Sequence, residues 1–135
     1  MLYKISHNVA ANTAEDSPDW QKLAITRGII VQWIVFMPEE AADLLKIRVE
    51  YHGTQILPYT GKDWLYGIFM PAVIEDKLKI YDTPYVLDIY AINSDDTFSH
   101  EYNLYVNVEP PQPVKPGGIP STTLERFRSL FGGGR

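Results

Sequence analysis

The chain has 135 residues, of which 12 are Lys or Arg and 17 are Asp or Glu, giving a formal net charge of −5. Nucleic-acid binding needs clustered positive charge, so this balance disfavours a nucleic-acid partner. Cysteine is absent, which excludes disulfides, iron–sulfur clusters and a thiol nucleophile. No apolar run approaches the ~20 residues of a membrane span. The first residues do not have the apolar core of a signal peptide.

The first 23 residues are expected to form an irregular N-terminal segment, apart from a short edge strand over 1–5. Residues 8–19 are rich in Ala, Asn, Asp, Ser and Pro, a composition typical of loops. The run 24–36 is apolar and β-branched at both alternating sets of positions, with Ile29, Val31, Trp33 and Val35 on one face. This pattern predicts a strand covered on both faces, by the core and by a partner or arm.

The middle of the chain is typical of an antiparallel hairpin. Residues 39–45 are long enough for only a single turn, so no helix is predicted there. Residues 45–51 alternate apolar and charged side chains, which predicts a half-buried strand. A turn at 52–54 and a short partner strand at 55–57 complete the hairpin.

The second half of the body predicts further strands. Gly and Pro interrupt 64–74, which favours an edge or bulged strand, and 75–82 is expected to be a charged connection. Two alternating strands follow at 85–93 and 99–108, joined by a turn at 93–97. The fold class expected is therefore all-β: an antiparallel β-sandwich of about seven strands, Ig-like or jelly-roll-like, spanning 1–108.

The composition changes after the last strand. Residues 109–120 are rich in Pro and Gly and predict an extended linker. Residues 121–135 are expected to form a short amphipathic helix over 123–131 with a glycine-rich end, because Thr122 and Glu125 fit a capping box. The apolar side chains expected to bind a partner are Val114, Ile119, Leu124, Phe127, Leu130 and Phe131. Docking onto another subunit is favoured, and docking onto the same sandwich is the alternative.

Residues that could carry chemistry are sparse. His7, His52 and His100 have no spacing that places two imidazoles on one metal, so we expect no metal, no cofactor and no catalytic residue. His100 is expected to bond to the preceding turn. Asp95 and Asp96 suggest a cation site, but without alternating ligands a solvated turn is favoured.

Three aromatic residues, Tyr59, Trp64 and Tyr66, surround a predicted loop and are candidates for stacking against a sugar ring. Aromatic side chains of a small β-domain pack in cores and interfaces more often than they bind ligands. A carbohydrate-binding module is therefore one alternative function. A small hydrolase is disfavoured because no nucleophile–base pair is recognisable.

Three segments carry a resemblance: ITRGII at 25–30, YHGTQILP at 51–58, and the stretch 84–100 ending in NSDDTFSH. Over about residues 25–108 the chain resembles small uncharacterised β-sandwich proteins of tailed phages and environmental viral sequences. The resemblance implies a non-catalytic virion component, such as a capsid decoration (cement) protein, or else a head–tail or tail subunit. Its implied partners are a major capsid protein or neighbouring copies in a homo-oligomer, with assembly in the host cytoplasm before residence in the virion.

Overall fold

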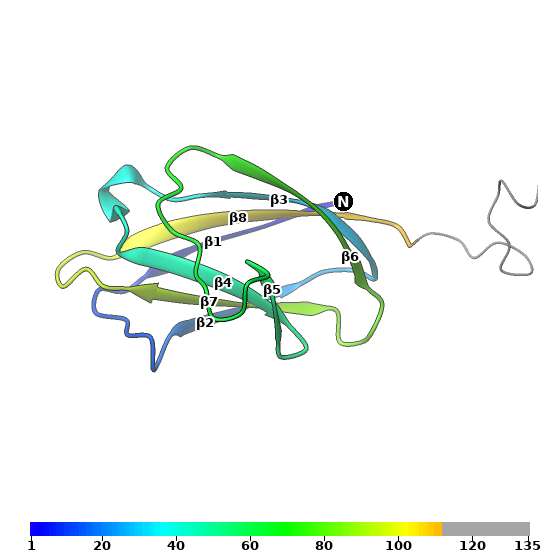
Figure 1. The fold of residues 1–135 in the computed structure, drawn as a ribbon, viewed down its shortest axis with the longest axis horizontal. Helices are drawn as coiled ribbons and strands as arrows, with labels where there is room; N and C mark the ends of the chain where they lie inside the picture. The colour runs from blue at the N-terminus through cyan, green and yellow to red at the C-terminus, as the bar shows by residue number, and fades with distance from the viewer. Residues whose placement is uncertain (112–135) are drawn as a thin grey trace, which may run out of the picture.

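The computed structural model describes residues 1–111, which form two four-stranded antiparallel sheets packed face to face (Figure 1). Sheet A has the strand order β1-β8-β3-β6, and sheet B the order β2-β7-β4-β5. The strands are β1 (Leu2–Val9), β2 (Asp19–Ala24), β3 (Gly28–Phe36), β4 (Leu45–Tyr51), β5 (Thr54–Leu57), β6 (Ala72–Ile80), β7 (Val86–Asn93) and β8 (His100–Glu109). A 3-10 turn, η1 (Glu39–Ala41), follows β3.

The strands pair as nested hairpins. β1 pairs with β8, β2 with β7, β3 with β6, and β4 with β5. The pairs β3–β8 and β4–β7 then join these hairpins within each sheet. The expected all-β sandwich is confirmed, with eight strands in the described residues instead of about seven.

The differences from the expected strands lie in two segments that the sequence pattern misassigned. Residues 1–23 are not irregular, because β1 and most of β2 lie there. The segment expected to be a charged connection, 75–82, belongs mostly to β6, whereas 64–71 is the loop that leads into β6. β2 and β6 are both sheet edges, where charged side chains discourage pairing with other chains and weaken the apolar signal.

The core lies between the sheets and follows the alternation of the central strands. In β8 the inward side chains are Tyr102, Leu104, Val106 and Val108, all buried as expected. β4 begins and ends where the pattern predicted, and the turn after it has positive φ at His52 and Gly53, as a tight hairpin turn of the I′ type requires. Among residues 1–111, no helix is long and apolar enough to cross a membrane.

β3 departs from strict alternation. Its register with both neighbours shifts between Ile30 and Gln32. Opposite β8 the extra residue is Val31 of β3, whereas opposite β6 the extra residue lies on β6, between Glu75 and Leu78. The bulge brings Ile30 onto the same inward face as Trp33, and both are fully buried. Two-face coverage of this strand was expected. Its outer face is half-buried at Ile34, and no other element of residues 1–111 forms a layer over it, so the expected cover by a partner or arm stays a prediction.

Gly28 is required where β3 meets the end of β8. A Cβ at this position would lie 2.3 Å from the carbonyl oxygen of Glu109 and 2.8 Å from Cγ1 of Val108. This close approach lies at the end of the sandwich where β8 ends (Figure 1).

β8 extends one residue beyond the expected end of the body at Val108. Of the predicted linker (109–120) and terminal helix (121–135), everything from residue 112 onward lies outside the described residues.

Candidate functional site

Within residues 1–111, no group of three or more His, Cys, Asp or Glu side chains is arranged to hold a metal ion. His7 and His100 each pair with a single aspartate, at 3.0 Å from Asp19 and 2.8 Å from Asp95. The remaining imidazole, His52, lies 3.1 Å from the carbonyl oxygen of Pro84. Each of the three histidines therefore contacts a different residue.

The turn before β8 uses its own polar groups. The side-chain oxygen Oδ1 of Asn93 accepts a hydrogen bond from the Asp95 amide at 3.1 Å, and Oδ1 of Asp95 accepts from the Thr97 amide at 2.9 Å and the Phe98 amide at 3.1 Å. The bond from the Thr97 amide is the main cause of a lowered pKa for Asp95, followed by the bond to His100. The expected hydrogen bond of His100 to the turn is confirmed. The Asp95 oxygens that were considered as cation ligands accept hydrogen bonds within the turn.

The three aromatic residues that were candidates for stacking against a sugar do not line one hollow. Trp64 and Tyr66 line a shallow hollow together with Lys46, but Tyr59 does not line it. Lys46 Nζ lies 4.7 Å from the centroid of the Tyr66 ring, and Arg48 Cζ lies 4.5 Å from that of Trp64. One face of each ring is therefore already in contact with a cation of the same chain.

Trp64 is the end of a ladder of stacked side chains across the outer face of sheet B. Trp20, Tyr90 and Arg48 are paired across β2, β7 and β4 at the same register. The Trp20 and Tyr90 rings are stacked at 6.3 Å and 7°, and Arg48 Cζ lies 5.0 Å from the Tyr90 centroid. We call Trp20, Tyr90, Arg48 and Trp64 the aromatic ladder. Burial raises the pKa of the Tyr90 hydroxyl, with Glu50 and Asp88 adding to the effect.

The outer face of sheet A carries a different row. Lys4, Tyr105, Ile34 and Val73 are paired in register across β1, β8, β3 and β6. Phe36 extends the row towards one end of the sheet, stacking on Tyr105 at 6.3 Å and 18°. We call Val73, Ile34, Tyr105 and Phe36 the apolar row. Val73 is 56% exposed, and Phe69, in the loop before β6, is exposed as well and lines a hollow together with Phe36.

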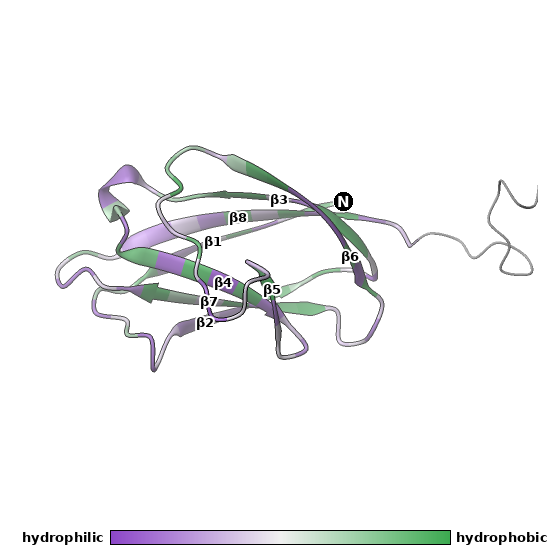
Figure 2. Ribbon diagram, viewed as in Figure 1, coloured by the Kyte–Doolittle hydropathy of each residue, from purple (hydrophilic) through white to green (hydrophobic). Residues whose placement is uncertain are grey.

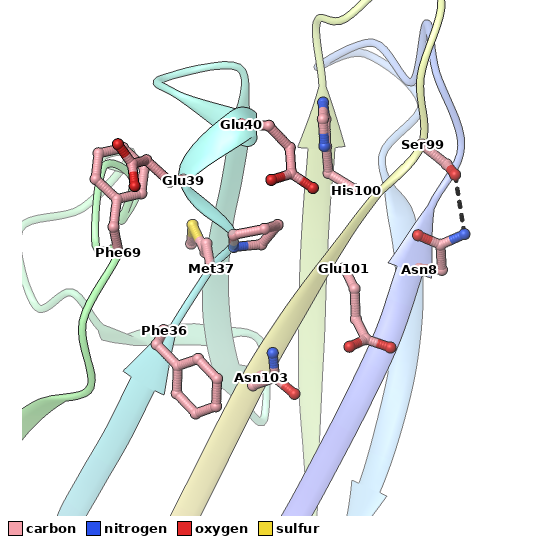
Figure 3. A pocket seen from close by; sticks show the side chains of 11 residues that line it. Asn8, Phe36, Met37, Glu39, Glu40, Phe69, Ser99, His100, Glu101 and Asn103 are labelled. Atoms are coloured by element: carbon pink, nitrogen blue, oxygen red, sulfur yellow. Dashed lines mark hydrogen bonds between the residues drawn. The ribbon is translucent and has the colours of Figure 1, made fainter.

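The apolar row ends in a hollow with an acidic rim (Figure 3). Phe36 and Phe69 lie on one side of it, and the carboxylates of Glu39, Glu40 and Glu101 surround it. All three glutamates are exposed. η1 and the start of β8, which supply them, are also the hydrophilic segments at this end of the sandwich (Figure 2). We call this site the acidic hollow.

Sequence reasoning missed the acidic hollow. Glu39 and Glu40 follow β3, whereas Glu101 is about sixty residues later at the start of β8, and no spacing connects them. Only the β3–β8 pairing brings these two strand ends together. The one signal in the sequence was the second apolar face of β3, which indicated a partner without locating it.

The six apolar residues expected to bind a partner, Val114, Ile119, Leu124, Phe127, Leu130 and Phe131, lie outside the described residues. Their role therefore stays a prediction. Comparisons with protein-family models, with curated proteins and with solved structures found no match for this chain.

Proposed function

We propose that this protein is a non-catalytic structural component of a virus particle, most simply a capsid decoration protein. The sandwich is its body, and residues 109–135 clamp neighbouring subunits, which are copies of itself or a major capsid protein. The observation that carries the proposal is the partly exposed apolar row on the outer face of sheet A, over which no other element of residues 1–111 forms a layer.

Apolar side chains gathered on one exposed face are typical of an interaction surface. Ile34 and Val73 are direct cross-strand neighbours, and Phe36 stacks on Tyr105 beside them. Covering such a face contributes about 25 cal/mol for each Å² of apolar surface removed from water. A subunit repeated in a shell has a neighbour at hand to cover it.

The strand order supports the finer assignment of the sandwich to the jelly-roll type. Each strand pairs with its counterpart counted from the other end of the body, giving the orders β1-β8-β3-β6 and β2-β7-β4-β5. Eight strands wound as two Greek keys form a jelly roll, an architecture used by viral capsid and lectin domains. Fold analogy of this kind adds to the proposal without carrying it.

The viral role is tested by locating the protein. Antibodies against the purified chain, applied to particles from the source that encodes it, should label those particles at regular positions in electron micrographs. Label confined to the fraction that remains after particles are removed would contradict a virion role.

The clamp is tested by deleting the residues after Pro110. We expect the deletion to abolish self-assembly in light scattering while the melting temperature of the body stays within about 2 °C, because the described core lies wholly before Pro110. Unchanged assembly combined with a lower melting temperature would instead show that the segment docks on its own body.

A carbohydrate-binding module is the second candidate, favoured by the exposed Tyr66 beside the hollow that contains Trp64 and Lys46. A glycan array with the wild type and with Tyr66→Ala tests it. Binding that is lost in the variant supports this function, and an array without any binding removes it.

A further inference from the structure

The charge of the chain is divided unequally between its two parts. Residues 112–135 contain four basic residues and one acidic residue, a net charge of +3. Subtracting them from the totals of 12 and 17 leaves 8 basic and 16 acidic residues in 1–111, a net charge of −8. The charged residues of the C-terminal segment are Lys115, Glu125, Arg126, Arg128 and Arg135. The segment and the body are therefore electrostatically complementary.

The C-terminal segment and the outer face of sheet A also match in their order of residue types. In the sequence, Arg126 and Arg128 flank Phe127, and further apolar residues follow up to Phe131. On sheet A the carboxylates of Glu40 and Glu101 lie at the end of a row of apolar side chains. Arginine pairs well with carboxylates, and its planar group also stacks on aromatic rings such as that of Phe36.

We propose that the acidic hollow and the apolar row together form the acceptor site for residues 124–131 of a neighbouring copy of this chain. Arg126 and Arg128 bind at Glu40 and Glu101, and the apolar residues of the segment cover the apolar row. The inference rests on the proposed clamp and specifies where on the body the clamp binds.

The position of the chain exit favours a neighbouring copy over the same body. β8 begins beside the acidic hollow and ends at Glu109, at the far end of sheet A. The run 110–116 contains four prolines, a composition that favours an extended chain of about 3.1 Å per residue. From its composition we expect such a run to span about 20 Å, and a run that keeps the direction of β8 leads away from its own hollow. A second copy placed ahead of that exit presents its hollow without any reversal of the chain.

A pair of charge-reversed full-length variants tests the site. One is altered in the acceptor (Glu40→Lys with Glu101→Lys) and the other in the segment (Arg126→Glu with Arg128→Glu). Sedimentation velocity in low salt should show self-association of the wild type and at least about a tenfold weaker association of each variant alone. Mixing the two variants should restore association, because each segment then meets an acceptor of opposite charge on the other chain.

The control variant, Glu15→Lys with Asp16→Lys, makes the same charge change as the acceptor variant, but in the exposed β1–β2 loop. It should associate like the wild type.

Three results would overturn the inference. A wild type that is monomeric at every concentration excludes docking between copies. Variants that associate like the wild type, while deletion after Pro110 still abolishes assembly, place the acceptor elsewhere and leave the proposed clamp intact. If the control variant loses as much self-association as the acceptor variant, the effect is due to the overall charge of the chain and not to a specific site. Antibody labelling of particles is independent of all three results, so a failed acceptor site and a failed virion role are distinguishable.

Discussion

The two outer faces of the sandwich are built from similar side chains and differ in what covers them. On sheet B, Trp20, Tyr90, Arg48 and Trp64 stack on one another in a continuous series. On sheet A, Tyr105 contacts Phe36 and the Lys4 ammonium, and its cross-strand neighbours beyond are the aliphatic Ile34 and Val73, of which Val73 is more than half exposed. Aromatic content alone therefore does not identify a binding face. The faces differ in how far the stacking continues: on sheet B it links three strands and the loop that holds Trp64, whereas on sheet A it ends at the aliphatic side chains of the apolar row.

The loop between β5 and β6 accounts for much of this difference. Leu65 forms a β-bridge with Ile47 of β4, which holds Trp64 against Arg48. The same loop then crosses to sheet A, where the Met37 amide donates to the carbonyl oxygen of Ile68 at 2.7 Å. It thus completes the ladder on sheet B but only borders the acidic hollow on sheet A, where Phe69 lies. The contrast predicts that substitutions on the outer face of sheet B affect stability, and those on the outer face of sheet A affect assembly.

The largest effect is expected where sheet A is closed at the chain exit. Gly28→Ala places a methyl group 2.3 Å from the Glu109 carbonyl oxygen, so β3 and the end of β8 must move apart. We expect the free energy of unfolding to fall by about 2–3 kcal/mol in chemical denaturation. Gly61→Ala is the matched control, since nothing lies within 4 Å of its added Cβ, and it should change the same free energy by less than about 1 kcal/mol. Equal effects of the two substitutions would contradict the role given to Gly28.

The next effect is expected in the aromatic ladder. Arg48→Ala removes the cation between Tyr90 and Trp64 and the ion pair with Glu50, whose Oε2 lies 3.3 Å from Nε of Arg48. We expect a loss of about 1–2 kcal/mol in the free energy of unfolding and unchanged self-association. Arg48→Lys keeps the charge without the planar group, so it should recover only part of the loss. Full recovery would show that charge, and not stacking, matters at this position.

A smaller effect on stability, with a larger one on assembly, is expected on sheet A. Ile34→Thr with Val73→Thr makes the apolar row more polar while keeping β-branched side chains that suit strands. The free energy of unfolding should change by about 1 kcal/mol or less, because neither side chain is fully buried. Self-association should weaken about tenfold, the loss expected when about 1.4 kcal/mol of binding free energy is removed. Val86→Thr, the same type of change on the outer face of sheet B, should leave association unaltered.

The sequence was sufficient to locate the central strands, because a strand buried on one face has apolar residues at every second position. β4 and β8 were located to within a residue for this reason, with Glu50 and Glu101 on their outer faces. β2 has only Trp20 and Leu23 as large apolar residues, and the end of β6 alternates Lys with Leu and Ile. Such edge strands resemble loops when local composition is considered alone.

The site was less predictable than the fold because its parts come together only through topology. The second apolar face of β3 was visible at Ile34 and Phe36, which are half-buried in residues 1–111, and the cover by a partner or arm that it predicted stays a prediction. Whether Glu101 would lie beside it depended on the pairing of β3 with β8, which local pattern does not specify. The ladder was missed for the same reason, because Trp20 and Trp64 meet only through two intervening strands.

The smallest effect is expected in the turn that connects β7 of sheet B to β8 of sheet A. Its Asp95 carboxylate accepts hydrogen bonds from two turn amides and lies 2.8 Å from His100 Nε2, which lowers its pKa below the ordinary value of 3.8. A carboxyl whose pKa is lower in the folded state stabilises the fold fully above its unfolded pKa. That contribution is lost as the pH falls through the folded pKa, so this turn should weaken only below about pH 3.8.

Asp95→Asn should therefore reduce the acid sensitivity of the urea midpoint between about pH 4 and 2, because the titrating group is gone. Asp96→Asn is the matched control, since that carboxylate accepts a hydrogen bond from the Thr97 hydroxyl and lies outside the His100 pair. Asp95 also shares a hollow with Glu40, a residue of the proposed acceptor. If acid weakens self-association in the Asp95→Asn variant as much as in the wild type, the pH dependence of association does not arise in the turn. Loss of that dependence in the variant would instead show that the turn sets the shape of the acceptor.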